Sequence, residues 1–98
     1  MKEKYLIRWT SRFKKDFKLA VKQGRDIGRL KFVVGLIAKG DEQERLAKDY
    51  DDHALSGEWK DYRELHLCPD WLLIYTVQED VLVLTLSRTG THAKLFGK

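Results

Sequence analysis

Three strand-like segments joined by very short turns fill the second half of the sequence, and they constrain the fold more than any other feature. They cover residues 59–67, 71–77 and 81–88. Turns as short as Pro69-Asp70 and residues 78–80 join antiparallel neighbours, because a parallel crossover needs a dozen or more residues. The middle segment is apolar on both faces, which is typical of a central strand. This half of the chain therefore predicts an antiparallel meander.

The first half of the chain changes from strand spacing to helix spacing. Apolar and polar side chains alternate over residues 5–9, so we expect a short strand there. Apolar residues then recur at helical spacing as far as Gly24, and lysines lie toward the other side. Thr10 and Ser11 precede this stretch, and both residue types cap helices well. The pattern predicts an amphipathic helix with a basic face.

A second helix begins after Asp26, which can cap it, and ends at Gly40, which suits a helix stop. Its apolar stripe is formed by Ile27, Leu30, Val33, Val34 and Ile37. The few residues around Gly24 between the two helices predict an antiparallel helical hairpin. Residues 41–52 are polar and hold six acidic side chains, and we expect a short helical turn plus a loop there.

These elements together predict one α+β domain over residues 1–98. We expect the N-terminal strand and the α-helical hairpin to pack on a four-stranded, mainly antiparallel sheet, with a tail from Thr89 onward. A chain of 98 residues builds one modest core. Its single cysteine fits a reducing compartment, so we expect the cytoplasm. The sequence shows no signal-peptide pattern and no apolar run long enough to span a bilayer, so we expect no membrane association.

The charge is distributed unevenly along the chain. Residues 1–39 hold twelve Lys or Arg and three acidic side chains, whereas residues 40–98 hold seven basic and twelve acidic ones. A basic half of this kind suits a polyanion such as RNA, or an acidic protein partner. On charge alone, a solvated surface with no specific partner is the better explanation, so charge by itself assigns no function.

Three histidines and a few charged residues form the set that can support chemistry. The histidines are His53, His66 and His92. Histidine gains and loses protons near neutral pH, and neighbouring strands bring distant residues to one rim of a sheet. Metal-free RNA cleavage needs a base, an acid and a positive clamp for the phosphorane. Asp70, at the turn after His66, and the guanidinium groups of Arg63 and Arg88 complete such a set.

Each of these residues also has an explanation without chemistry. Histidines in a loop, a strand and a tail are often solvated or hydrogen-bonded structural residues, and Asp70 after Pro69 is a turn former. Arg63 and Arg88 are residues of a type common on surfaces. A zinc site built on His66 and Cys68 matches no standard ligand spacing, so we expect no metal and no cofactor. Phosphate-binding glycine loops and a serine nucleophile elbow are absent from the sequence.

Three segments favour a catalytic role for these residues, because the segments resemble the motifs of one known family. Residues 52–66, DHALSGEWKDYRELH, resemble the motif DHPLxGxWxxYRDxH. Residues 69–75, PDWLLIY, are similar to PDWxLIY, and residues 88–97, RTGTHAKLFG, to RTGTHxxLFG. All three motifs belong to the YafQ branch of the RelE-like toxins, and they occur here in the same order with matching gaps. With the N-terminal strand and basic hairpin, the resemblance extends over nearly the whole chain.

The resemblance implies a RelE-like fold and the toxin activity of a type II toxin–antitoxin system. Its members cleave mRNA on the ribosome by acid/base catalysis without a metal, which inhibits translation and growth. It also implies a cognate antitoxin, DinJ-like and of the ribbon-helix-helix type, which blocks the toxin and helps to repress the shared operon. Operator DNA would then be contacted only through the antitoxin complex.

The family motifs also assign roles to residues of this chain. They place catalytic residues at His53, Glu64, His66, Asp70 and His92. In this assignment His66 and Asp70 form the base side with help from His53, and His92 protonates the leaving oxygen. Phe96 stacks on a nucleotide or holds the tail. To these we add phosphate contacts for Arg63 and Arg88, and contacts to ribosomal RNA backbone for helix lysines. The lysines are Lys14, Lys15 and Lys18.

Two departures from the motif bear on the site. Ala54 replaces the usual proline, which leaves the His53 loop less rigid. Glu64 replaces the common aspartate, which moves the carboxylate outward by one methylene. Two other hypotheses stand beside the endonuclease: a binding module that blocks translation without cutting, and a degenerate member that acts only as an antitoxin-bound co-repressor.

Overall fold

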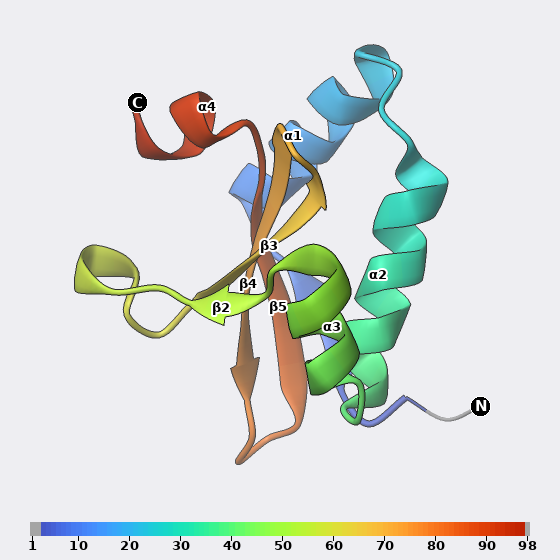
Figure 1. The fold of residues 1–98 in the computed structure, drawn as a ribbon, viewed down its shortest axis with the longest axis vertical. Helices are drawn as coiled ribbons and strands as arrows, with labels where there is room; N and C mark the ends of the chain where they lie inside the picture. The colour runs from blue at the N-terminus through green and yellow to red at the C-terminus, as the bar shows by residue number, and fades with distance from the viewer. Residues whose placement is uncertain (1–2, 98) are drawn as a thin grey trace.

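Five strands form one mixed sheet in the order β1-β5-β4-β3-β2, and four α-helices surround it (Figure 1). The computed structural model describes residues 3–97. The strands are β1 (Leu6–Trp9), β2 (His53–Ala54), β3 (Arg63–Cys68), β4 (Trp71–Gln78) and β5 (Val83–Gly90). The helices are α1 (Ser11–Lys22), α2 (Ile27–Lys39), α3 (Gln43–Tyr50) and α4 (His92–Phe96), and a 3-10 turn covers Gly57–Trp59.

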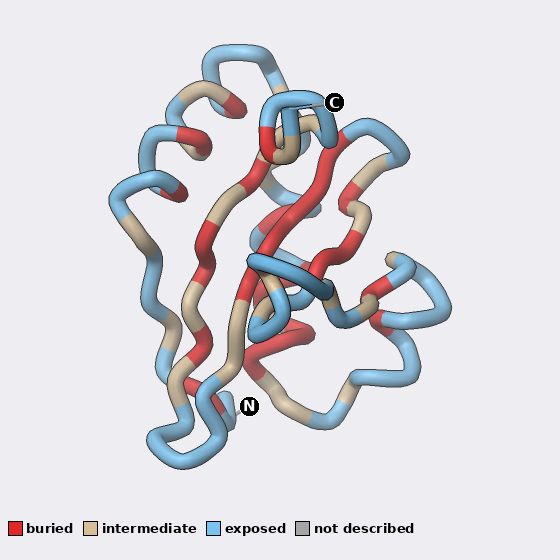
Figure 2. Tube along the Cα trace, turned by 90° about the vertical axis from the view of Figure 1, so that its left-hand side faces the viewer, coloured by how far each residue is buried: buried red, intermediate tan, exposed pale blue. Residues whose placement is uncertain are grey.

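The strand order confirms the predicted meander. β3, β4 and β5 pair antiparallel through short turns, and β4 is the middle strand of the sheet. Its residues 71–75 form an unbroken buried run, and Figure 2 shows the long buried stretches in the central strands. β1 lies parallel to β5, from Leu6 opposite Val83 to Trp9 opposite Leu86. The sheet is therefore mainly antiparallel with one parallel edge strand.

The helix ends follow the capping residues that the sequence predicts. The Thr10 hydroxyl accepts a hydrogen bond from the Phe13 amide at the start of α1, and the Asp26 carboxylate accepts one from the Arg29 amide at the start of α2. Gly40 ends α2 with a φ of 80°, in the left-handed region that glycine adopts without strain. Among residues 3–97, no helix is both long enough and apolar enough to cross a bilayer.

The sheet has a buried core on each face. On one face, the side chains of Leu65, Leu73 and Leu84 pack with those of α1, α2 and α3. On the other, Leu72 and Ile74 pack with Leu95 of α4 and with the segment between β2 and β3. Figure 1 shows α2 and α3 on one side of the sheet and α4 with the β2–β3 segment on the other. The second face is covered by fewer elements.

β5 begins at Val83 rather than at residue 81, because Leu82 adopts the left-handed conformation in the preceding turn, with a φ of 53°. Four other local features differ from the sequence-based expectation. The sheet has a fifth strand, β2, in a segment expected to be a loop, and two residues are too few to show a periodic pattern. Residues 43–50 form a full helix, although only Leu46 on it is buried, so no apolar stripe revealed it. β3 begins at Arg63 rather than at residue 59, because the 3-10 turn comes first.

The tail is the fourth difference, because it forms the short helix α4. The Thr91 hydroxyl caps this helix by accepting from the Lys94 amide, and Gly97 ends it in the left-handed region. The buried Leu95 anchors α4 on the sheet. A helix of five residues carries too little repeating pattern to be predicted from spacing.

Candidate active site

His53 and Glu64 face each other across the short β2–β3 pair. They are register partners, and His53 Nε2 lies 3.1 Å from Glu64 Oε2. Glu64 is only 4% exposed, and its second oxygen, Oε1, is buried without a hydrogen-bond partner among the described residues. A buried carboxylate oxygen without a partner is costly, which makes Glu64 a candidate for a functional role.

Asp51 connects both histidines of this sheet edge. It ends α3 in the left-handed conformation, with a φ of 54°. Its carbonyl oxygen lies 2.7 Å from His53 Nδ1, and its carboxylate lies 3.6 Å from His66 Nε2. Both ring nitrogens of His53 therefore face oxygen atoms, and two hydrogen bonds form only when both nitrogens carry hydrogen. The rings of His53 and His66 are 6.5 Å apart.

A second group gathers around α4. His92 and Phe96 lie one turn apart on this helix, with ring centroids separated by 4.7 Å. The Phe96 ring meets the edge of Trp59 at 5.9 Å, and Trp59 meets Tyr62 at 5.2 Å in the same perpendicular manner. Edge-to-face packing is a favourable arrangement for aromatic rings. These contacts hold α4 against the segment between β2 and β3.

Both groups share the less covered face of the sheet. Leu72 pairs with His66 and Ile74 pairs with Glu64 in the β3–β4 ladder, so all four side chains lie on one face. The same two apolar residues pack against Leu95 of α4. The apolar side chains of Leu72 and Ile74 therefore lie between two groups. His53, Glu64 and His66 are on one side of them, and the helix that carries His92 is on the other. This arrangement offers histidines for proton transfer on both sides of a bound phosphodiester.

Asp70 is at the β3–β4 turn, apart from these groups. Its carboxylate pairs with the guanidinium of Arg25 at 3.3 Å and not with a histidine, and it is exposed. Arg25 also lies over the Trp71 ring, 5.6 Å from its centre. The structure thus gives Asp70 a partner from the loop between α1 and α2 that the sequence did not indicate.

The two arginines are both engaged in ion pairs. Arg63 donates from Nε to Asp52 at 2.6 Å, on the helix-covered face of the sheet and away from the histidines. Burial alone would lower the pKa of Arg63, but the hydrogen bond to Asp52, the charge of Asp52 and the contribution of Tyr75 together raise that pKa. Arg88 donates from two nitrogens to Asp16 of α1, and its side chain is only 13% exposed. The hydrogen bond to Asp16 raises the pKa of Arg88.

The helix lysines do not line the histidine-bearing face. Lys14, Lys15 and Lys18 are exposed on α1. Lys14 and Lys18 border a groove of about 650 Å³ between α1 and α2, whose walls include Phe13, Phe17 and Val34. The structure therefore separates the basic helix from the candidate catalytic residues.

Some site residues lie outside the set selected from the sequence. Trp59 and Tyr62 stand inside the quoted motif, so their position there was the available signal. Asp51 directly precedes that motif, but only the fold shows that it contacts two histidines. Asp16 is the one acidic residue among the lysines of α1. Its isolated position was the available signal, which a total of charges over the whole half does not show.

The donors present do not fit a metal ion. Among residues 3–97, no three His, Cys, Asp or Glu side chains are gathered in a way that could hold one. The closest donors are paired with each other, as His53 is with Glu64.

Comparison with known proteins gives consistent matches. Residues 5–97 match the family model described as "Bacterial toxin of type II toxin-antitoxin system, YafQ". The mRNA interferase toxin YafQ of Escherichia coli K12 is 42% identical over 91 residues, which cover 93% of this chain and 95% of that protein.

Two solved structures are close in fold and sequence. The E. coli DinJ-YafQ toxin-antitoxin complex contains a chain that is 40% identical with a TM-score of 0.82, covering 96% of this chain and 99% of that one. A metal-bound toxin from Helicobacter pylori is 42% identical with a TM-score of 0.85, covering 94% and 99%.

Proposed function

This chain belongs to the YafQ family of bacterial type II toxin–antitoxin toxins, and from this membership we propose that it is an endoribonuclease that cleaves mRNA on the ribosome. The observation that supports it most directly is the face that joins His53, Glu64 and His66 with the helix bearing His92. The E. coli relative is named an mRNA interferase, which supports mRNA as the substrate of this chain.

In the reaction we propose, the 2′-hydroxyl of a ribose attacks the adjacent phosphorus. His66 accepts the proton of that hydroxyl as the new P–O bond forms. His92 donates a proton to the 5′-oxygen as the old P–O bond breaks, which leaves a 2′,3′-cyclic phosphate and a 5′-hydroxyl. His53, held between Glu64 and the Asp51 carbonyl, supports the developing negative charge.

Two further residues have assignments that depend on rearrangement. The family motif puts Asp70 on the base side, and that role requires its pair with Arg25 to open. Phe96 packs edge-to-face with Trp59. The Phe96 ring would stack on a base through a ring surface that Trp59 does not cover. We assign Arg63 and Arg88 first to their ion pairs, so phosphate binding by either requires competition with a carboxylate.

The partners follow from the same proposal. A DinJ-like antitoxin neutralises the toxin, as the complex of the E. coli relative suggests, and operator DNA is reached only through that complex. The lysines of α1 contact ribosomal RNA backbone, and an enzyme with this substrate acts in the cytoplasm.

Primer extension on a defined message in a reconstituted translation system tests the proposal. We expect the wild type to produce cuts only when ribosomes are present, and His92→Ala to reduce the cleavage rate at least about a hundredfold, because one proton-transfer group contributes roughly that much. Lys48→Ala, an exposed change on α3, serves as the control and should cut like the wild type.

The alternative is a binding module, which the concentration of basic residues on α1 supports. In that case the wild type would stall translation on an uncut message. Toxicity would then survive His92→Ala and be lost on charge reversal at Lys14, Lys15 and Lys18. That result would reject the catalytic proposal.

A further inference from the structure

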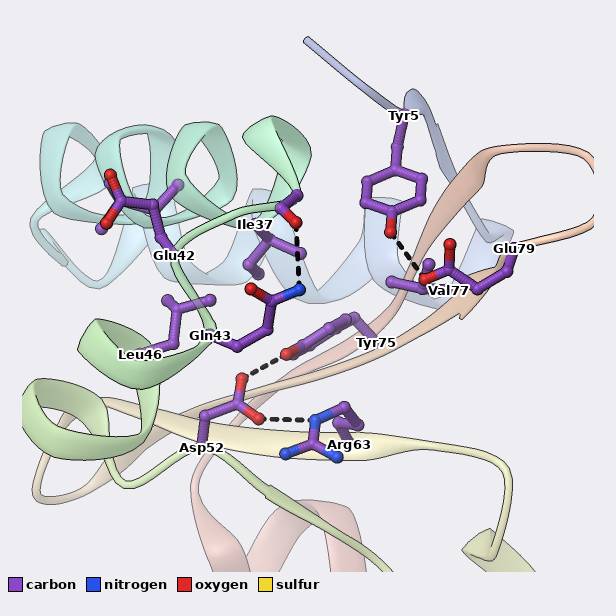
Figure 3. Close-up of a pocket in the computed structure, with 12 residues that line it drawn as sticks. Tyr5, Ile37, Glu42, Gln43, Leu46, Asp52, Arg63, Tyr75, Val77 and Glu79 are labelled. Atoms are coloured by element: carbon purple, nitrogen blue, oxygen red, sulfur yellow. Dashed lines mark hydrogen bonds and ion pairs between the residues drawn. The ribbon is translucent and has the colours of Figure 1, made fainter.

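A polar network with two buried members and the partly exposed Arg63 lies on the opposite face of the sheet from the histidines. The Asp52 carboxylate accepts from Arg63 Nε at 2.6 Å and from the Tyr75 hydroxyl (Figure 3). Asp52 is 8% exposed and Tyr75 is 3% exposed. The network borders a cavity of about 370 Å³ beneath α2 and α3, together with Gln43 and Leu46.

This network and the candidate site are back to back. Successive side chains of a strand point to opposite faces, so Asp52 and Arg63 point into the helix-covered side when His53 and Glu64 point to the other. Arg63 is the register partner of Ala54 on β2 and of Tyr75 on β4. The network therefore connects three neighbouring strands directly behind the pair of His53 and Glu64.

The β2 strand needs such a connection. It contains two residues, and its ladder consists of His53 opposite Glu64 and Ala54 opposite Arg63. Two residue pairs specify a register weakly, and a slip by one residue would turn His53 to the other face. A buried charge, in contrast, tolerates few positions, because it is stabilised only where its partners meet it.

We propose that Asp52 is a positioning residue: by binding Arg63 and Tyr75 on the covered face, it fixes β2 in the register that places His53 against Glu64 in the active site. Tyr75 supplies the fixed reference, because it belongs to the buried middle strand. Burial, and then the charge of Asp52, raise the pKa of Tyr75, so its hydroxyl remains a donor over the working pH range. The expected effect of Asp52 on RNA cleavage rests on the proposed function, whereas its effect on the position of His53 does not.

Two substitutions remove parts of the network, and a third is a matched control. Asp52→Asn removes the charge with little change in volume, and Tyr75→Phe removes the hydroxyl alone. Tyr5→Phe makes the same change to another buried tyrosine of the same cavity, whose hydroxyl donates to Glu79 at 2.6 Å and does not contact β2. Chemical denaturation identifies the conditions under which all three variants remain folded.

Cleavage is then measured in the wild-type and His53→Ala backgrounds. We expect Asp52→Asn and Tyr75→Phe to lower the first-order cleavage constant roughly ten- to a hundredfold with little change in KM, since a small misplacement of a catalytic group costs this much. In the His53→Ala background neither should lower it further, whereas their effects should add to that of His92→Ala. Tyr5→Phe should have no effect in any background.

Nitrogen NMR of the histidine rings gives a readout that needs no activity. We expect Asp52→Asn and Tyr75→Phe to change the shifts of the His53 nitrogens and to leave those of His92 unchanged. A further loss in the His53→Ala background, or unchanged His53 nitrogens in folded variants, would overturn the inference. If the wild type itself does not cut RNA, the proposed function fails, and the NMR result still decides whether Asp52 positions His53.

Discussion

At the scale of single residues, Glu64 shows most clearly where this protein departs from maximum stability. One of its oxygens contacts His53, and the other is buried with no partner among the described residues. Burial of an unpaired charged oxygen is unfavourable, and an amide is less costly to bury than a carboxylate. Stability and the proposed chemistry therefore make opposite demands on this position.

Glu64→Gln tests that conflict. We expect its free energy of unfolding to rise by about 0.5–1 kcal/mol, because the buried charge is removed. We expect the cleavage rate to fall about tenfold or more, because a hydrogen bond to a charged acceptor becomes a neutral one. Urea denaturation and single-turnover cleavage measure the two effects. A variant that is less stable and equally active would contradict both parts.

The sequence identified most of the residues on this face but not their contacts. His53, Glu64 and His66 were selected from the family motif, and the structure brings these three together. The pairing of His53 with Glu64 depends on β2, and two residues give no periodic signal. The pairing of Asp70 with Arg25 joins loops 45 residues apart, a contact that local patterns do not contain.

At the scale of elements, Asp16 holds α1 to β5 and α4. Its buried carboxylate accepts hydrogen bonds from Arg88 and from the Thr89 amide. The ammonium group of Lys94 on α4 lies 3.6 Å from the same carboxylate. Burial by itself would raise the pKa of Asp16, but the bonds from Arg88 and Thr89 outweigh it and leave that pKa below its ordinary value of 3.8. The ionised form is therefore favoured in the folded protein.

Asp16→Asn should reveal this contribution through its pH dependence. A carboxyl whose pKa is lower in the folded state stabilises the protein above the unfolded-state pKa, and the contribution disappears as pH falls through the folded-state value. We expect the variant to be about 2 kcal/mol less stable at pH 7. The difference from the wild type should shrink as the pH falls below about 4. Denaturation curves across this range provide the measurement, and a constant difference would contradict the assignment.

Elements with capping residues and long periodic stretches were predictable from the sequence. The ends of α1 and α2 follow Thr10, Asp26 and Gly40, and β4 follows its apolar run, whereas β5 begins two residues later than its apolar run because Leu82 belongs to the turn. The sequence predicts α3 only as a short helical turn and does not predict α4, because each buries a single side chain, Leu46 or Leu95. Their helices are specified by contacts with the sheet more than by local pattern.

At the scale of the whole molecule, the two faces of the sheet differ in how much apolar surface they bury. The helix-covered face holds the larger core, and the face with the histidines holds a small apolar cluster under α4. Stability is concentrated on the first face. On the second face, the side chain of His53 is 43% exposed and His92 is exposed as well.

Leu73→Ala tests how stability divides between the faces. Leu73 is fully buried in the larger core, and we expect its truncation to lower the free energy of unfolding by about 3 kcal/mol. Leu95→Ala truncates a residue of the smaller cluster on the other face, and we expect it to lower the free energy of unfolding by only about 2 kcal/mol. Equal effects in thermal or chemical denaturation would contradict this division.

The basic half of the chain leads to a prediction about the antitoxin. Because Lys14, Lys15 and Lys18 are exposed together on α1, we expect an acidic antitoxin segment to bind less tightly, by roughly tenfold, when salt rises from about 0.1 M to about 1 M. Titration calorimetry with the purified antitoxin measures this. An affinity that does not change with salt would show that the basic face is not part of the contact.

The parallel pairing of β1 with β5 makes completion of the sheet depend on residues from both halves of the chain. Leu6 at one end of the chain must wait for Val83 near the other, and α4 with His92 is made later still. A chain emerging from the ribosome with its N-terminus first can form its helices early, but it cannot close the sheet. The face that carries His53, His66 and His92 is therefore complete only after β5 and α4 have been made, although β1 and the helical hairpin are made first.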